Sequence, residues 1–173
     1  MKAVVVILIA VALGFGGYIL MNRPAQIPNM TFVDSEQARH SLDDIRGNKD
    51  TLLMVVLGSQ DLMSNYAVKK LNEWFPKYSK YVSFVGLMIG DNKAADTYQQ
   101  EKGVPFDIYS IRSGTNQQKL DEFINKSGKN YGCAGSTVYT GTVVVLDSER
   151  FMLFKLEKEQ LEELPGKLDE LGY

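Results

Sequence analysis

The sequence predicts an α/β domain, a central mixed sheet flanked by helices, preceded by an apolar N-terminal segment. Three observations carry this prediction. Short apolar runs bounded by Gly, Pro, Asp or Asn alternate along the chain with longer stretches of helical periodicity. The last two apolar runs are separated by only four polar residues, 147–150, which predicts a hairpin and therefore an antiparallel strand pair. Residues 3–21 carry no charge.

Length and composition limit the classes of function that the chain can serve. Its 173 residues suffice for one domain with an appendage. The 19 Lys and Arg residues are interleaved with 21 Asp and Glu residues, for a net charge of −2, so we expect no nucleic-acid partner. Cys133 is the single cysteine and His40 the single histidine, which excludes an intramolecular disulfide and a cysteine-rich metal site. We expect no metal and no cofactor.

The uncharged stretch 3–21, AVVVILIAVALGFGGYILM, predicts a transmembrane helix that contacts the membrane. At 1.5 Å per residue, a helix of this length spans about 28 Å, close to the roughly 30 Å hydrocarbon core of a bilayer. A cleavable signal peptide is the alternative, with Gly14-Phe15-Gly16 as its cleavage site, because the apolar core of such peptides is about 7–15 residues long. The apolar run continues to Met21, and this length favours an uncleaved signal-anchor.

The anchor is followed by a linker and then by the folded domain. Residues 22–29, NRPAQIPN, hold two prolines among polar residues and predict a short, stiff, extended linker. Lys2 precedes the apolar stretch and Arg23 follows it, so the positive-inside rule does not decide the orientation. The predicted organisation is a signal-anchor over 1–21, a linker over 22–29 and one domain over 30–173.

The elements of the domain are predicted from the period of their apolar residues. Period-two or continuous apolar runs predict strands over 30–33, 52–57, 81–89, 106–111, 142–146 and 151–156. Helical periodicity predicts helices over 62–75, ending at Pro76, over 93–102, ending at Gly103, over 117–125, and over 157–171, bent near Pro165. Residues 34–46 are predicted to form a turn or short helix, and the Gly-, Ser- and Thr-rich stretch 127–141 a loop.

The stretch 51–71, TLLMVVLGSQDLMSNYAVKKL, joins a buried strand to the helix predicted over 62–75 through a tight turn. The first N–H groups of a helix are unpaired and favour negative charge, so this junction is where an α/β protein often places its chemistry. Asp61 lies at the junction and is a suitable N-cap for the helix.

The residues before the turn resemble a known family. Ser41 to Leu57, SLDDIRGNKDTLLMVVL, is similar to the entry to the catalytic strand in the redoxin branch of the thioredoxin superfamily, which includes membrane-anchored thiol:disulfide oxidoreductases. The resemblance implies a thioredoxin-like sandwich and, for an anchored domain, a location in the bacterial periplasm at the inner membrane. It places Asp61 and Ser64 where that family has its two cysteines, and Gly141 where it has a cis-proline.

These two departures predict a domain without dithiol chemistry, because neither Asp nor Ser undergoes thiol–disulfide exchange. We expect no catalytic residue and a protein partner instead. The resemblance implies that the partner binds the face formed by Ser59, Gln60, Asp61, Ser64, Gly141 and Thr142. The simpler interpretation is that Asp61 only caps its helix.

Two alternatives remain open at the level of sequence. Cys133, in a glycine-rich stretch, would serve a single-cysteine thiol-disulfide oxidoreductase or peroxidase-like protein by forming mixed disulfides. An incidental, packed thiol is the other interpretation of the same residue. A structural subunit that assists assembly of an envelope complex is a third function, and the sequence does not separate it from partner binding.

Overall fold

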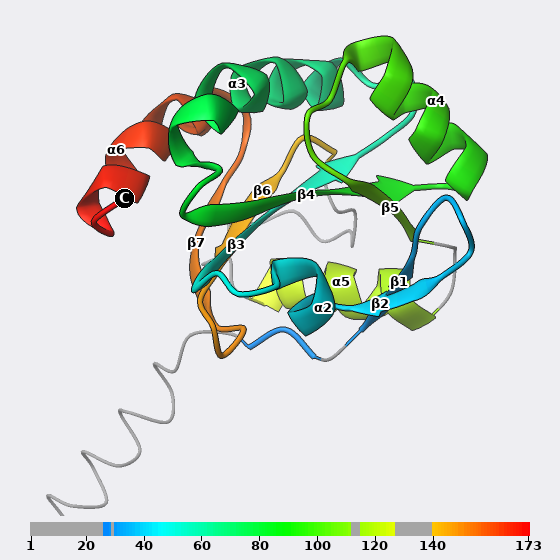
Figure 1. Ribbon diagram of the computed structural model, residues 1–173, viewed down its shortest axis with the longest axis horizontal. Helices are drawn as coiled ribbons and strands as arrows, with labels where there is room; N and C mark the ends of the chain where they lie inside the picture. The colour runs from blue at the N-terminus through cyan, green and yellow to red at the C-terminus, as the bar shows by residue number, and fades with distance from the viewer. Residues whose placement is uncertain (1–25, 29, 112–114, 127–139) are drawn as a thin grey trace, which may run out of the picture.

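The structure is a computed structural model that describes residues 26–28, 30–111, 115–126 and 140–173 (Figure 1). Its strands are β1 (Thr31–Val33), β2 (Arg39–Ser41), β3 (Thr51–Leu57), β4 (Val82–Ile89), β5 (Ile108–Ile111), β6 (Val143–Leu146) and β7 (Met152–Leu156). Its helices are α2 (Leu42–Arg46), α3 (Leu62–Tyr78), α4 (Asn92–Lys102), α5 (Thr115–Lys126), the 3₁₀ helix η1 (Lys158–Glu163) and α6 (Leu164–Glu170).

The strands form a seven-stranded sheet in the order β2-β1-β5-β4-β3-β6-β7. β3 pairs in parallel with β4, which pairs in parallel with β5. All the other pairs are antiparallel: β1 with β2 and β5, β6 with β3, and β7 with β6. The sheet is therefore mixed, and β3 lies in its interior, as the sequence predicts.

Helices cover both faces of the sheet, with α3, α4 and α6 on one face and α2 and α5 on the other (Figure 1). Alternate residues of β3 enter two separate cores. Leu53, Val55 and Leu57 pack toward the α3 face. Leu52, Met54 and Val56 belong to the opposite core. A strand buried on both faces needs apolar side chains at every position, which explains the uninterrupted apolar run.

The central helix extends further than the sequence predicts. α3 passes through Pro76 and ends at Tyr78. Pro76 lies in the last turn, where its missing N–H removes one helical hydrogen bond without ending the helix. The amide of Ser79 still donates to the Phe75 carbonyl at 2.9 Å. The predicted end at Pro76 was therefore wrong by one turn or less.

The C-terminal stretch is also different from its prediction, which was one helix bent near Pro165. It forms η1 followed by α6, and Pro165 lies in the first turn of α6. The N–H groups of a first helical turn have no intrahelical partner, so proline begins this helix at little cost. Leu161, Leu164 and Leu168 are fully buried against the α3 face. A further difference is β2, a three-residue strand that the sequence did not reveal.

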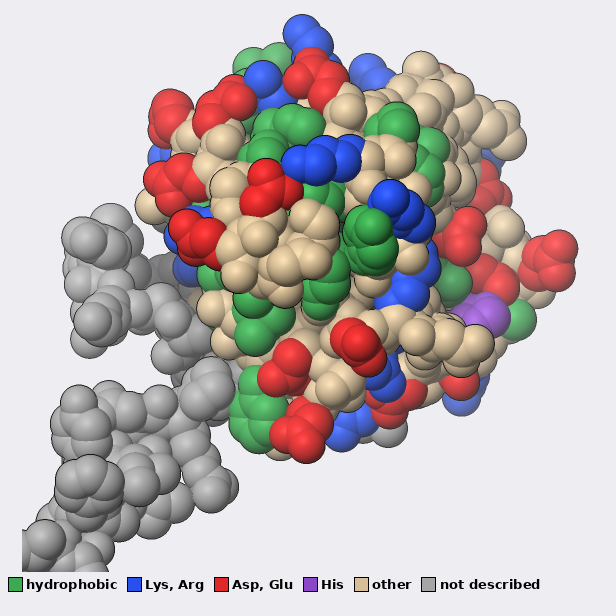
Figure 2. Space-filling view, turned by 60° about the vertical axis from the view of Figure 1, so that its left-hand side comes forward, with side chains coloured by type: hydrophobic (Ala, Val, Ile, Leu, Met, Phe, Trp, Pro, Cys, Tyr) green, Lys and Arg blue, Asp and Glu red, His purple; other side chains and the backbone are tan. Residues whose placement is uncertain are grey.

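Charged side chains of both signs cover the surface. Figure 2 shows Lys and Arg side chains dispersed among Asp and Glu side chains on one face of the molecule. Among the described residues, no helix is long and apolar enough to cross a membrane. The predicted transmembrane segment 3–21 lies outside the described residues.

Candidate functional site

The junction between β3 and α3 is a four-residue turn at the carboxyl end of the central strand. Asp61 is the N-cap of α3, with extended backbone angles (φ −99°, ψ 134°). Its carboxylate accepts a hydrogen bond from the backbone N–H of Ser64 at 2.8 Å. This contact satisfies one of the unpaired donors of the first helical turn, and the negative charge is favoured by the helix dipole. The predicted capping role of Asp61 is confirmed.

A network of side chains joins the two positions where the resembled family has cysteines. The Ser64 hydroxyl donates to Asp61 Oδ2 at 3.0 Å and accepts from the Gly58 amide at 2.8 Å. The hydroxyl of Thr140, from the segment that leads into β6, donates to the same Oδ2 atom at 2.5 Å. Since the two hydroxyls and the Ser64 amide all donate to one carboxylate oxygen, the turn, the helix and the distant segment are held together by hydrogen bonds.

This network sets the charge state of Asp61. Partial burial raises the pKa of the Asp61 carboxyl, but hydrogen bonds from Thr140 and Ser64 outweigh burial and hold the pKa below its usual value. Asp61 is therefore ionised at neutral pH and engaged as a hydrogen-bond acceptor. An ionised, tightly held carboxylate is suited to fixing the turn, and it has no proton to give in general acid catalysis.

Gly141 lies directly against the first turn of α3. Its φ is +83°, and a Cβ atom at this position would lie 2.7 Å from the backbone oxygen of Met63. The Gly141 amide donates to the Val56 carbonyl at 2.7 Å, and the Val56 amide donates to the Thr142 carbonyl at 2.9 Å. Only glycine combines this backbone conformation with so close an approach. The segment entering β6 is thus packed onto the turn.

The structure brings all six predicted binding residues into this one region, but gives them different accessibility. Ser59 and Gln60 are exposed, and Asp61 is partly exposed. Ser64 is 0% exposed, and Gly141 and Thr142 are buried as well. The buried residues shape the site from beneath, and a partner would reach only the turn above them. Their role in binding stays a prediction.

Leu62 is an apolar residue of this face and the first residue of the predicted helix 62–75. In the sequence it begins a helical apolar stripe with Tyr66 and Val68. The structure shows that it is 82% exposed, the most exposed of the large apolar residues described. The first residue of α3 extends past the end of β3, where none of the described elements covers it. An apolar residue directly after an N-cap was the available signal.

A cleft of about 360 Å³ lies beside the turn, between Ser59, Gln60 and one side of α4. Asp91, Lys93 and Glu101 supply charges of both signs to its rim. Tyr98 forms its inner wall and donates from its hydroxyl to Asn65 Oδ1 at 3.2 Å. Burial, with the nearby Asp61 charge, raises the pKa of Tyr98 to about 12. The phenol is therefore neutral at physiological pH and acts as a hydrogen-bond donor.

The remaining sequence candidates contribute no described group to this site. Cys133, the residue of the single-cysteine alternative, lies outside the described residues. Within the part of the chain that the structure describes, no cluster of His, Cys, Asp or Glu has the geometry to hold a metal ion. The chemistry available at the turn is hydrogen bonding and apolar contact.

The mixed sheet, the helices on both faces and a strand-turn-helix junction at the carboxyl end of the central strand define a thioredoxin-like fold. Solved structures of this class superimpose on nearly the whole domain. They include the thioredoxin domain of a thiol-disulfide oxidoreductase from Bacteroides vulgatus (TM-score 0.64, 13% identity, 84% of this chain and 96% of that chain covered). A thiol-disulfide oxidoreductase from Bacteroides fragilis matches similarly (TM-score 0.63, 19% identity, 84% and 98% covered).

A peroxidoxin from Mycobacterium tuberculosis has the same architecture (TM-score 0.60, 11% identity, 84% of this chain and 92% of that chain covered). No protein-family model matches the sequence, and no curated protein is similar to it in sequence. The likeness is therefore one of structure. The chain has the thioredoxin-like fold that the resemblance implied, and with its single cysteine it has no CxxC motif.

Proposed function

We propose that this protein is a membrane-anchored thioredoxin-like domain that binds a protein partner and performs no thiol–disulfide exchange at the α3 turn. Two features of the turn support the second part of the proposal. The positions of the family's cysteines hold Asp61 and Ser64, and neither side chain can form a mixed disulfide. Their 3.0 Å hydrogen bond joins the two positions without any redox chemistry.

The exposed side chain of Leu62 carries the proposal of partner binding. It is 82% exposed at the tip of α3, with exposed Ser59 and Gln60 before it and the cleft beside α4 adjacent to them. Complete burial of such a side chain in a partner is worth about 1.5–3 kcal/mol. A central apolar anchor with a polar surround is the usual arrangement of a protein-binding hot spot. The partner we infer is a protein with a small apolar pocket.

The proposed location follows from the segment before the domain. The uncharged stretch 3–21 is long enough to span a bilayer, and only residues 22–25 separate it from Gln26, which contacts the domain. We place the domain in the periplasm of a bacterium, attached to the inner membrane, where it binds a partner or assists assembly of an envelope complex. The orientation rests on the resemblance to anchored redoxin domains.

Site-directed photocrosslinking in membranes tests the binding face. A photoreactive amino acid at Gln60 of the full chain is expected to capture a partner of defined mass. Leu62→Ser should reduce that product by about tenfold or more, because 1.4 kcal/mol of lost binding corresponds to a factor of ten. Leu153→Ser is the matched control, since Leu153 is a 40% exposed leucine on β7. Equal capture by wild type and Leu62→Ser would refute the role of this face.

A redox assay tests the absence of thiol chemistry. Full-length protein and its Cys133→Ser variant are compared for reduction of insulin disulfides and for trapped mixed disulfides. The proposal expects neither protein to turn over insulin. Turnover by wild type that disappears in Cys133→Ser would overturn it in favour of a single-cysteine enzyme.

A further inference from the structure

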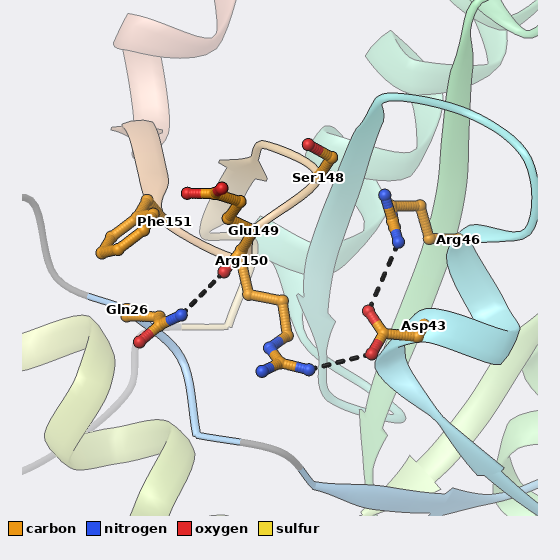
Figure 3. Close-up of a pocket in the computed structure, with 7 residues that line it drawn as sticks. All are labelled: Gln26, Asp43, Arg46, Ser148, Glu149, Arg150 and Phe151. Carbon is orange, nitrogen blue, oxygen red and sulfur yellow. Dashed lines mark hydrogen bonds and ion pairs between the residues drawn. The ribbon is translucent and has the colours of Figure 1, made fainter.

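A second pocket lies at the opposite end of β3 from the Asp61 turn. Its volume is about 500 Å³, and it is formed by α2, by the turn between β6 and β7, and by Gln26 (Figure 3). β3 begins beside this pocket, because Leu52 pairs with Leu146 at the end of β6. The seven residues of β3 separate the two sites by roughly 23 Å at about 3.3 Å per residue.

Two guanidinium groups approach one carboxylate in this pocket. Arg150 Nη1 lies 2.9 Å from Asp43 Oδ2, and Arg46 Nη2 lies 3.4 Å from Asp43 Oδ1 (Figure 3). Glu149 also lines the pocket, so it contains two cationic and two anionic side chains. The Nε atoms of Arg46 and Arg150 are shielded from water and have no hydrogen-bond partner among the described residues. Each arginine therefore has one N–H donor that the described residues do not use.

Arg150 has an unusual backbone conformation for a residue with a side chain. Its φ is +68°, in the left-handed region where glycine or asparagine is usual. The turn is held by Asp147 Oδ1, which accepts from the amides of Glu149 at 2.9 Å and Phe151 at 2.8 Å. Arginine brings strain to this position that glycine would not, and strained residues of this kind concentrate at binding sites.

The pocket is also the place where the chain enters the domain. Gln26 donates from its side chain to the Glu149 carbonyl at 2.9 Å, and the Ile27 amide donates to the Arg150 carbonyl at 3.0 Å. The proposed anchor ends at residue 21, so four residues, 22–25, connect it to Gln26. Four residues reach at most about 14 Å. A domain anchored in this way holds the Arg46–Arg150 pocket within reach of the lipid headgroups.

We propose that this pocket binds the headgroup of a zwitterionic phospholipid, a phosphate bonded to an ethanolamine. The phosphate oxygens would accept from the Arg46 and Arg150 guanidinium groups, the side chains best suited to planar oxyanions. The ammonium group would donate to the carboxylates of Glu149 and Asp43. Equal numbers of both charges match a zwitterion better than a purely anionic headgroup. This inference rests on the membrane anchor of the proposed function.

Headgroup binding would fix how the domain stands on the membrane. The pocket and the Leu62 face lie at opposite ends of β3, so holding one end against the bilayer directs the other away from it. The partner-binding face would then be presented at a constant height. Without the headgroup contact, the short linker would restrain the distance of the domain but not its orientation.

The test measures this orientation in the full chain. The Cys133→Ser variant is reconstituted in lipid nanodiscs, and a new cysteine carries a spin label. The label is placed either at Asn48→Cys, an exposed position two residues from Arg46, or at Gln60→Cys. A nickel chelate on the lipid surface relaxes labels that lie near it. We expect strong relaxation at position 48 and weak relaxation at position 60 in phosphatidylethanolamine discs. Phosphatidylcholine discs, whose headgroups lack ammonium N–H donors, should show a smaller difference.

Variants assign the effect to the pocket. Arg150→Gly suits the φ of +68° and should keep the thermal midpoint while losing the phosphatidylethanolamine-dependent relaxation at position 48. Arg46→Gln should lose it too. Arg39→Gln removes the same charge from exposed β2 and should retain it. Unchanged relaxation in both pocket variants, or a greater effect in phosphatidylglycerol than in phosphatidylethanolamine discs, would overturn the proposal.

Failure of this inference is distinguishable from failure of the anchor. A chain that co-elutes with the discs but shows no effect of Arg150→Gly refutes headgroup binding alone. A chain that does not enter the discs refutes the anchor, and with it the headgroup site, while leaving the Leu62 crosslinking result unaffected.

Discussion

Substituting Gly141 by alanine is expected to destabilise the protein far more than an ordinary glycine substitution. Two separate costs act at this position. The φ of +83° is unfavourable for an L-residue by about 1–2 kcal/mol. The new Cβ would also lie 2.7 Å from the Met63 oxygen and 2.8 Å from its carbonyl carbon, contacts that backbone movement must relieve.

The second cost sets the size of the effect. Overpacking against rigid neighbours typically costs about 1–3 kcal/mol. Alanine recovers about 0.4–1 kcal/mol by restricting the unfolded chain. Together these figures give a loss of about 1–5 kcal/mol in the free energy of unfolding, against the 5–15 kcal/mol typical of a domain.

Gly103→Ala is the matched control for this prediction. Gly103 caps α4 with a φ of +57°, yet nothing lies within 4 Å of its hypothetical Cβ. It carries the conformational cost without the clash, so we expect a loss of about 1 kcal/mol or less. Urea unfolding of the full chain in detergent, followed by fluorescence of Trp74, the single tryptophan, measures both. Equal losses in the two variants would show that Met63 does not limit the space at Gly141.

Three further predictions concern side chains around the two sites. Folding lowers the pKa of Asp61, so Asp61 stabilises the protein above pH 3.8, its ordinary pKa. This contribution disappears as the pH falls through the lower pKa of the folded state. In a plot of the urea unfolding midpoint against pH, Asp61→Asn should therefore reduce the slope on the acid side. Folding raises the pKa of Tyr98 from 10.0 to about 12, so its contribution to the free energy of unfolding is complete below pH 10 and is lost as the pH rises through about 12. Ultraviolet titration should show one late-ionising phenol that is missing in Tyr98→Phe. Arg150→Gly relieves the strain of a left-handed residue but removes a partly exposed ion pair with Asp43, which is worth about 0–1 kcal/mol. Thermal unfolding should therefore show a midpoint equal to or above that of wild type. A clear decrease would show that the ion pair outweighs the strain.

Local patterns in the sequence were sufficient for the parts of the fold that depend on neighbouring residues. The uninterrupted apolar run of β3 predicted a strand buried on both faces, because each face of the sheet carries its own core. The N-cap at Asp61 was also predictable, since its partner Ser64 is three residues away. Pro76 and Pro165 were harder, because the effect of a proline depends on which turn of a helix it occupies.

The sites required the tertiary structure, because their members come from distant segments. The hydrogen bond from Thr140 to Asp61 joins residues 79 apart in sequence, and the pair of Arg150 with Asp43 joins residues 107 apart. Helical periodicity puts Leu62 in one apolar stripe with Tyr66 and Val68, and the structure shows that it is exposed at the end of β3, where no described element covers it. The sequence by itself determined the missing dithiol and the order of the strands and helices, apart from β2 and the division of the C-terminal helix into η1 and α6. The tertiary structure decided which residues meet and which face solvent, because both depend on how the strands pair across the sheet.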